Sequence, residues 1–186
     1  MIEFDIGSPM RRATHPGAVN FNREETNMSM QFLVRAAVAA SALVVSGSAL
    51  AQAYGEPIGV ESARKAAAAA VAESKKNNWN MAVSVVDTGG HLVYFERMDN
   101  TQTGSATVAT QKAQSAVAFR RPTKAFEDVV AGGGAGLRIL TLAGAIAIEG
   151  GVPIVVNGKI VGAIGASGGT APQDGVVAKA GVDALK

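Results

Sequence analysis

The sequence VPIVVNGKIVGAIGA, residues 152–166, places two apolar runs on either side of the dipeptide Asn157-Gly158. Asn-Gly between apolar runs is the strongest short-range signal for a two-residue β-hairpin, because both residues of such a turn need a positive φ. The pattern therefore predicts two antiparallel strands, Val152 to Val156 and Lys159 to Ala166.

A second hairpin is predicted earlier in the chain. Met81 to Val86 alternates as a strand, and His91 to Arg97 alternates again. Between them lies Asp87-Thr88-Gly89-Gly90, whose residue types favour a tight turn.

Alanine-rich segments around these hairpins predict helices. Glu61 to Lys76 and Ser105 to Phe119 carry Ala at helical spacing, and we interpret Lys112 as lying off the apolar face of the second helix. These small-residue faces are candidates for contacts between copies of the chain.

Pro122 interrupts the chain after the second helix, and Thr123 is positioned to cap a short helix through Val130. Residues 131–136 predict a flexible glycine loop, and Leu137 to Ile148 fits either a helix or a strand. The last helix is predicted to reach about Leu185, starting from a capping box formed by Thr170 and Gln173 with Pro172 near its first turn.

The order helix, hairpin, helices, hairpin, helix predicts an α+β fold, in which helices pack against an antiparallel sheet. A doubly wound nucleotide-binding fold is disfavoured, because it would require strands that alternate with helices.

The first part of the chain predicts export. Residues 1–29 have no helical or strand period and are interpreted as a non-structural extension or a mis-called start. Residues 30–51 resemble a signal peptide: Arg35 is followed by an uncharged apolar segment and by the cleavage pattern Ala49-Leu50-Ala51. A membrane-spanning helix is the alternative, but the segment is mostly Ala, Ser, Gly and Val, so no stable anchor is expected. A single domain, residues 52–186, would then be periplasmic or secreted.

Composition restricts the chemistry of the site. The 186 residues include no Cys, which excludes disulfides, thiolate catalysis and Cys-ligated metals. The net charge is +2 with scattered charges, so no nucleic-acid partner is expected. His91 is the one His of the predicted domain, which disfavours a catalytic triad and leaves no catalytic residue assigned.

Three motifs together resemble the GlcG/HbpS family of small haem-associated proteins, which includes the C-terminal domain of PduO. They are Val85 to Val93, Phe119 to Thr123, and the run from Glu149-Gly150-Gly151 to Ser167-Gly168-Gly169. The resemblance covers roughly Val60 to Lys186. It implies a profilin-like sheet of about five strands, a homo-oligomer, and haem as the cofactor.

The resemblance also suggests which residues bind the ligand. Arg97-Met98-Asp99 matches a family motif, and some relatives carry a first-helix His that Glu61 to Lys76 lacks. Free N–H groups where the last helix begins favour an anion such as a propionate, a phosphate or a small carboxylate. His91 or Met98 is the candidate axial ligand of the iron. The full set of candidate cofactor-binding residues is Arg97, Met98, Lys112, Arg121, Thr123, Ser167, Gly168 and Gly169.

Three functions are compatible with these residues. The first is an exported haem- or tetrapyrrole-binding protein that scavenges, buffers or senses its ligand. The second is an enzyme of the same fold that degrades haem or acts on a small carboxylate. The third is an accessory or assembly protein without a ligand. Fold alone does not choose among them.

Overall fold

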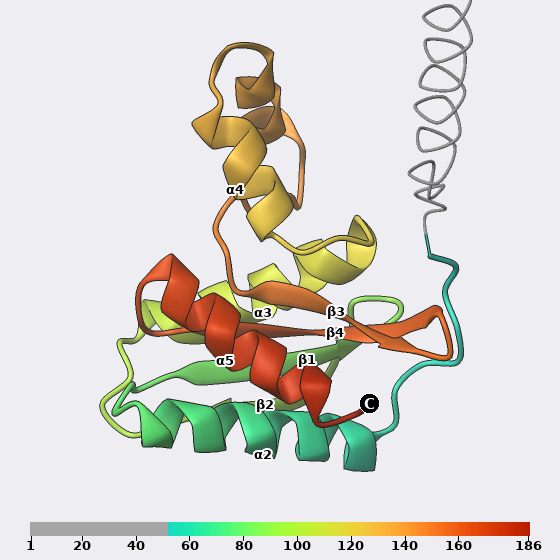
Figure 1. Ribbon diagram of the computed structural model, residues 1–186, viewed down its shortest axis with the longest axis vertical. Coiled ribbons are helices and arrows are strands. Elements are labelled where there is room, and N and C mark those ends of the chain that lie inside the picture. The colour runs from blue at the N-terminus through green and yellow to red at the C-terminus, as the bar shows by residue number, and fades with distance from the viewer. Residues whose placement is uncertain (1–51) are drawn as a thin grey trace, which may run out of the picture. The chain divides into compact units, whose positions relative to one another are not determined.

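The computed structural model describes residues 52–186, and Figure 1 shows two hairpins forming one sheet with helices against it. The predicted extension (1–29) and signal peptide (30–51) lie outside the described residues. Within residues 52–186, no helix has the length and hydrophobicity needed to span a bilayer.

The elements follow the predicted order, and their bounds agree with the predicted ones to within two residues, except over residues 131–148, where a 3₁₀ helix begins at Gly134 inside the predicted glycine loop. In chain order they are α2 (Val60–Lys76), β1 (Ala82–Asp87), β2 (Leu92–Arg97), α3 (Gly104–Ala118), α4 (Lys124–Ala131), the 3₁₀ helix η1 (Gly134–Thr141), β3 (Gly151–Val156), β4 (Lys159–Ser167) and α5 (Ala171–Asp183).

The four strands form one antiparallel sheet in the order β2-β1-β4-β3. At the turn between β3 and β4, Asn157 and Gly158 have φ of 50° and 74°, as a type I′ hairpin requires. The α+β prediction is confirmed, but the described residues hold four strands rather than about five. The nearest feature to a fifth is one parallel bridge between Tyr54 and Ile160, beside which the N–H groups of Gly55 and Ile58 donate to carbonyl oxygens of β4.

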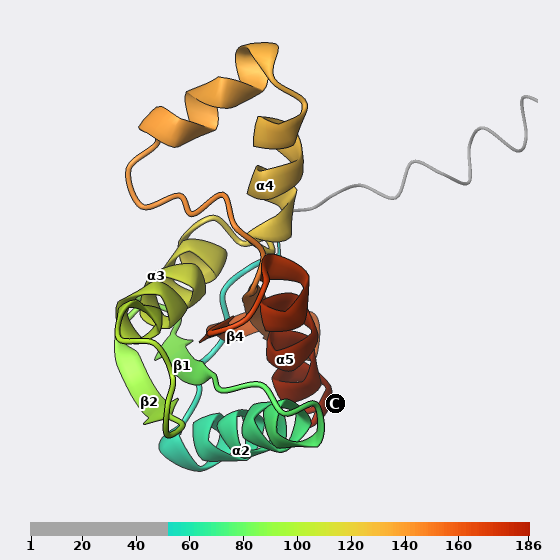
Figure 2. The same cartoon turned by 90° about the vertical axis from the view of Figure 1, so that its left-hand side faces the viewer.

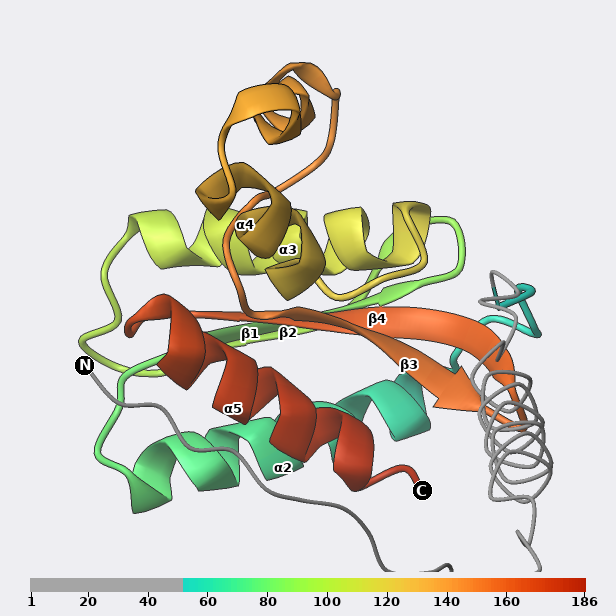
Figure 3. The same cartoon turned by 45° about the horizontal axis from the view of Figure 1, so that its top comes forward.

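Helices cover both faces of the sheet (Figures 1 and 3). α2 and α5 pack on one face around Val83, Val85 and Ile164, and α3 packs on the other around Val86 and Ala163. Each face therefore has its own apolar cluster, as the alternation of side chains along β1 and β4 requires.

The alanine-rich helix faces are interior surfaces. In α2 and α3 the Ala side chains at helical spacing are fully buried against the sheet and α5. Small residues allow this close packing: a Cβ at Gly165 of β4 would lie 2.0 Å from the carbonyl oxygen of Ala109 in α3. The expectation that these faces mediate contacts between copies is therefore wrong.

Residues 124–149, which we call the arm, project away from the sheet (Figures 1 and 2). The arm contains α4 and η1, which pack against each other, and an irregular segment that returns to β3. The ambiguous segment Leu137 to Ile148 is thus neither a helix nor a strand over its whole length. Gly144 interrupts it with a positive φ of 80°, and Gly133 and Gly134, which precede it, also have positive φ.

Candidate ligand-binding site

Lys112 forms a buried ion pair that joins α3 to α5. Its Nζ donates to Asp174 Oδ2 at 2.6 Å and to the carbonyl oxygen of Ala166 at 3.3 Å. The two side chains are 1% and 4% exposed. Lys112 therefore lies inside the α3 face rather than off it, and its charge is compensated in the interior by Asp174, so this structure gives it a structural role.

Burial raises the pKa of Asp174, although the hydrogen bond and the charge of Lys112 act to lower it. The other carboxylate oxygen of Asp174 accepts from the backbone N–H of Gly169 at 3.0 Å. Asp174 is thus held from two sides, by a cation and by a backbone donor.

The beginning of α5 is occupied by groups of the chain itself. Asp174 accepts the Gly169 N–H, and Gln173 Oε1 accepts the Thr170 N–H at 2.9 Å in the expected capping box. Ser167 is buried at the end of β4. The N–H groups of Gly169 and Thr170 therefore donate to side chains of α5 itself, and an anion at Ser167-Gly168-Gly169 would have to replace these acceptors.

Thr123 has a structural role at the base of the arm. Its backbone N–H donates to the carbonyl oxygen of Gly151, and its Oγ1 accepts from the Gly151 N–H, both at 2.9 Å. Thr123 is fully buried and makes no side-chain cap for α4. These two hydrogen bonds tie the residue that precedes the arm, Thr123, to the first residue of β3, Gly151, and so hold the two ends of the arm together.

Arg97 and Met98 lie at the end of β2, at the same end of the sheet as Ser167. Ala82 of β1 pairs with Arg97 on one side and with Ser167 on the other. Met98 packs partly into the core. Together with neighbouring polar side chains, Arg97 and Met98 line a shallow pocket of about 360 Å³. The sequence motifs of β2 and β4 thus meet at one sheet end.

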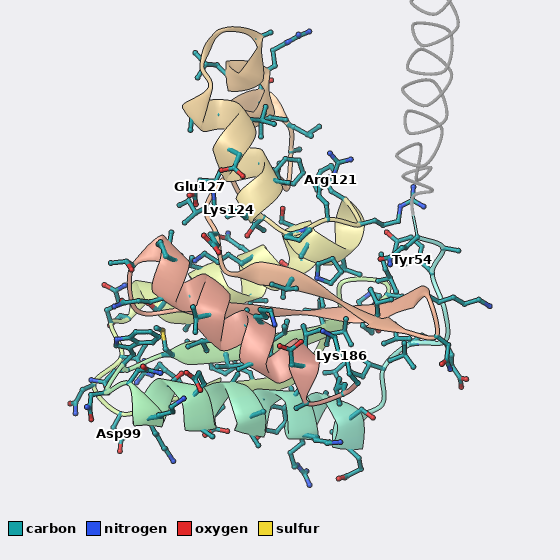
Figure 4. The ribbon with its side chains drawn as sticks, in the orientation of Figure 1. Tyr54, Asp99, Arg121, Lys124, Glu127 and Lys186 are labelled. Atoms are coloured by element: carbon teal, nitrogen blue, oxygen red, sulfur yellow. The ribbon has the colours of Figure 1, made fainter. Side chains whose placement is uncertain are left out.

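Arg121 lies beside the arm. Its guanidinium is 5.5 Å from the ring centroid of Phe126, and its Nε donates to the carbonyl oxygen of Phe119. Figure 4 shows Arg121 on one side of the beginning of α4, with Lys124 and Glu127 on the other. Arg121 and Arg97 are therefore placed by different elements, at the arm and at the sheet end.

His91 is exposed in the β1–β2 turn. Its Nδ1 lies 3.3 Å from Asp87 Oδ1, and its side chain is 82% exposed. Burial acts to raise the pKa of Asp87, but hydrogen bonds from the backbone N–H groups of His91 and Gly89 outweigh it, so the pKa is lowered. The carboxylate orients the imidazole and leaves Nε2 accessible, an arrangement common for histidine ligands.

A cleft of about 310 Å³ separates the base of the arm from α5. Its walls include Pro122 of the second motif and the segment from Glu149 to Val152 of the third. On the α5 side lie Gly175, Val182 and polar residues, so the walls are largely apolar and glycine-lined. The charged groups of the cleft are the lysines Lys124, Lys179 and Lys186 and the carboxylates Glu149 and Asp183.

The lysines of this cleft are held by nearby carboxylates that a ligand could replace. Lys124 pairs with Asp128, while Lys179 and Lys186 both pair with Asp183. Exposed pairs of this kind contribute little stability, so an anionic ligand can exchange with them at small cost. Burial, followed by the charge of Glu127, raises the pKa of Glu149.

The fit of haem to these residues is partial. The cleft supplies apolar walls and cations for the haem carboxylates, but among its lining residues there is no His, Met, Tyr or Cys to bind iron. His91 and Met98, the candidate axial ligands, lie on the β1–β2 turn and at the end of β2. Over residues 52–186 no three His, Cys, Asp or Glu side chains are grouped as a metal site.

Sequence reasoning missed the partner of Lys112 and most of the α5 wall. The signal for burial was present, because Ala109, Lys112, Ala113 and Ala116 have the spacing of one helix face. A Lys on such a face requires a buried carboxylate. Nothing local marked Asp174 as that partner, since it stands 62 residues away.

Comparison with known proteins places this geometry in a family. Residues 58–183 match the model of the family described as "Haem degrading protein HbpS-like". Protein GlcG of Escherichia coli K12 is 41% identical over 100 residues, which are 54% of this chain and 73% of GlcG.

Two solved structures are similar in fold and in sequence. The crystal structure of HbpS has a TM-score of 0.65 at 30% identity, with 71% of this chain and 92% of HbpS covered. The PduOC:heme complex has a TM-score of 0.63 at 28% identity, with 69% and 94% covered.

Proposed function

This chain belongs to the family of HbpS-like haem-degrading proteins, and from that premise we propose that it binds haem in the cleft between the base of the arm and α5. The proposed location depends on one observation: two family motifs line the same cleft. Pro122 belongs to one motif and the segment from Glu149 to Val152 to the other, and the cleft has apolar walls with lysines at its rim. The related PduOC structure was solved as a complex with haem.

In this proposal the porphyrin lies along the apolar walls, and its carboxylates replace Asp128 and Asp183 as partners of the rim lysines. Iron bound in the haem would supply redox chemistry, whereas the residues of the cleft bind and orient the ring. Because the lining includes no His, Met, Tyr or Cys, these residues would hold haem by its apolar ring and its carboxylates rather than by its iron.

Haemin titration tests the location of the site. The double variant Lys124→Ala/Lys179→Ala is expected to bind haemin about tenfold more weakly, the order of effect for two exposed charge pairs. Soret absorbance measures the binding, and Lys65→Ala on the exposed face of α2 is the matched control. A loss of affinity in Arg121→Ala or His91→Ala, with the lysine variant unchanged, would contradict this cleft.

The second candidate function is haem degradation, which the description of the family favours. The same titrated sample distinguishes haem degradation from haem storage or haem sensing. Loss of the Soret band when a reductant and oxygen are added, at a rate above that of free haemin, indicates turnover. A stable band indicates binding alone.

We further propose that the chain is exported and that its mature form begins at Gln52 or Tyr54. The support is the order of a basic residue, an apolar segment and small residues at Ala49 and Ala51. N-terminal sequencing of periplasmic material is expected to give one of these two starts. Recovery of the protein in the membrane fraction with residues 30–51 intact would exclude cleavage.

We also propose that the protein self-associates. The support is the exposed apolar surface of the arm, because such surface is usually covered in solution. Light scattering of the mature protein at micromolar concentration is expected to give a mass several-fold above that of one chain. A monomeric mass under these conditions would refute the proposal.

A further inference from the structure

Glu149 differs from the other charged residues that line the cleft, because it has no ion-pair partner. Lys124 pairs with Asp128, and both lysines on the α5 side pair with Asp183. Within residues 52–186 the carboxylate of Glu149 forms no ion pair with any Lys or Arg. A ligand that enters the cleft therefore meets one carboxylate whose charge no direct partner compensates.

The position of Glu149 is set by the base of the arm and by α5. Its backbone N–H donates to Glu127 Oε2 at 2.7 Å, and it directly precedes Gly150. Its half-buried side chain extends to α5, where a Cβ at Gly175 would lie 2.7 Å from the carboxyl carbon of Glu149. Gly175 is a buried residue inside the helix, where glycine is less favourable than alanine. The carboxyl group of Glu149 thus rests against the backbone of α5, in space that a side chain at position 175 would fill.

Charged groups from three helices surround Glu149. α4 contributes two carboxylates and a lysine, α3 a lysine, and α5 a carboxylate next to Gly175 and a lysine one turn further along the cleft: Glu127, Asp128, Lys124, Lys112, Asp174 and Lys179. Each of these lysines already has a carboxylate partner. Burial, and then the charge of Glu127, raise the pKa of Glu149, and the two lysines of α3 and α4 offset this only in part. Protonating Glu149 therefore costs less free energy than protonating an ordinary glutamate.

We propose that Glu149 is a specificity-determining residue of the cleft, which admits an anionic ligand together with a proton; this inference rests on the haem site proposed above. As a carboxylate, Glu149 repels the carboxylates of the ligand across a cleft with apolar walls. As a neutral acid it ends this repulsion and has an O–H that can donate to a ligand carboxylate. The affinity for the ligand then depends on the charge of Glu149, and binding takes up a proton.

The direction of the pH dependence follows from this linkage. An anionic ligand beside Glu149 raises the pKa of its carboxyl group further in the complex, because like charges disfavour the ionised form. The affinity should therefore begin to rise as the pH falls below the pKa of Glu149 in the complex. It should stop rising below the pKa of Glu149 in the free protein, where the acid is already neutral before the ligand arrives.

Haemin titration of Glu149→Gln tests the role of this charge. Glutamine has nearly the shape of the neutral acid, and the backbone N–H of residue 149 can still donate to Glu127, so the fold should persist by circular dichroism. At about pH 8 the variant is expected to bind haemin about fivefold more tightly than the unmodified protein, the upper range for one partly exposed charge pair. The ratio of the two affinities should fall toward one as the pH is lowered to about 5. Protonation of haemin itself does not affect this ratio, since both proteins bind the same ligand.

Two control variants separate the charge of Glu149 from its shape and from the net charge of the protein. Glu149→Asp keeps the charge and is not expected to bind haemin more tightly at about pH 8. Glu61→Gln removes a carboxylate that is 81% exposed on α2, and it should bind as the unmodified protein does. Equal affinity of Glu149→Gln and the unmodified protein at every pH, or a ratio that does not change with pH, would overturn the inference. Haemin affinity that is unaffected by Lys124→Ala/Lys179→Ala would instead refute the proposed haem site, and the inference with it.

Discussion

Lys112→Met is expected to lower the free energy of unfolding by about 3–5 kcal/mol, the range for removing one partner of a buried ion pair. Methionine fills most of the space of the lysine chain, so the main loss is electrostatic. The carboxylate of Asp174 keeps its backbone donor at Gly169 but loses the Lys112 ammonium 2.6 Å away. Chemical denaturation measures the change, and Lys65→Met on the exposed face of α2 is the control.

The double variant Lys112→Met/Asp174→Leu separates the loss of the pair from the cost of an isolated charge. Removing both charges is expected to recover part of the stability, because a buried pair often contributes little over apolar side chains. Recovery is incomplete, since the Gly169 N–H loses its acceptor, at about 1–3 kcal/mol. A double variant as unstable as the sum of the single variants would show that the two side chains act independently.

The pH dependence identifies the isolated carboxylate. Burial already raises the pKa of Asp174 in the folded protein, and without Lys112 it is raised further, because the group that lowers it is gone. A folded-state pKa above the unfolded one destabilises at neutral pH; the penalty begins to shrink as the pH falls below the folded pKa and is lost near the unfolded pKa. The stability gap between Lys112→Met and the unmodified protein should therefore narrow from pH 7 toward about pH 4. The variant Asp174→Asn has no carboxyl to titrate at this position. The difference in stability between Asp174→Asn and the unmodified protein should therefore not narrow in this way.

Local chemistry made most of the fold predictable. Asn157-Gly158 requires a turn with positive φ, and the paired Thr170 and Gln173 begin α5 as expected. The alternation along β1 and β4 gave strands with correct bounds to within two residues. Each of these signals depends on residues that are neighbours in sequence, so it can be recognised from the sequence alone.

What could not be predicted depends on distant partners. Lys112 meets Asp174 only when α3 and α5 pack against the same strand end, and no local pattern marks that meeting. The segment Leu137 to Ile148 was ambiguous between helix and strand, because a short apolar run has no periodicity that distinguishes the two. Two of the three motifs, Phe119 to Thr123 and the run that begins at Glu149, contribute residues to the cleft at the base of the arm, but the lysines of α5 had no motif to distinguish them.

Gly168→Val is expected to destabilise the fold by more than about 3 kcal/mol, because Gly168 combines a positive φ with close approach to a neighbouring backbone segment. Gly168 has φ of +152°, and a Cβ there would lie 2.2 Å from the carbonyl oxygen of Asn80 and 2.9 Å from the Cα of Met81. Backbone strain of about 1–3 kcal/mol adds to overpacking of about 1–3 kcal/mol or more. The clash is with backbone, which a rotamer change cannot relieve.

A matched substitution separates these two contributions. Gly144 also has a positive φ, +80°, but a Cβ there meets nothing within 4 Å, so Gly144→Val should show the strain without the clash. Thermal and denaturant unfolding are expected to rank the unmodified protein above Gly144→Val, and Gly144→Val above Gly168→Val. If Gly168→Val were as stable as Gly144→Val, the chain from Asn80 to Met81 would have to move away from the end of β4. The expected order instead identifies Gly168 as the residue that allows the end of β4 to lie against the segment from Asn80 to Met81 that leads into β1.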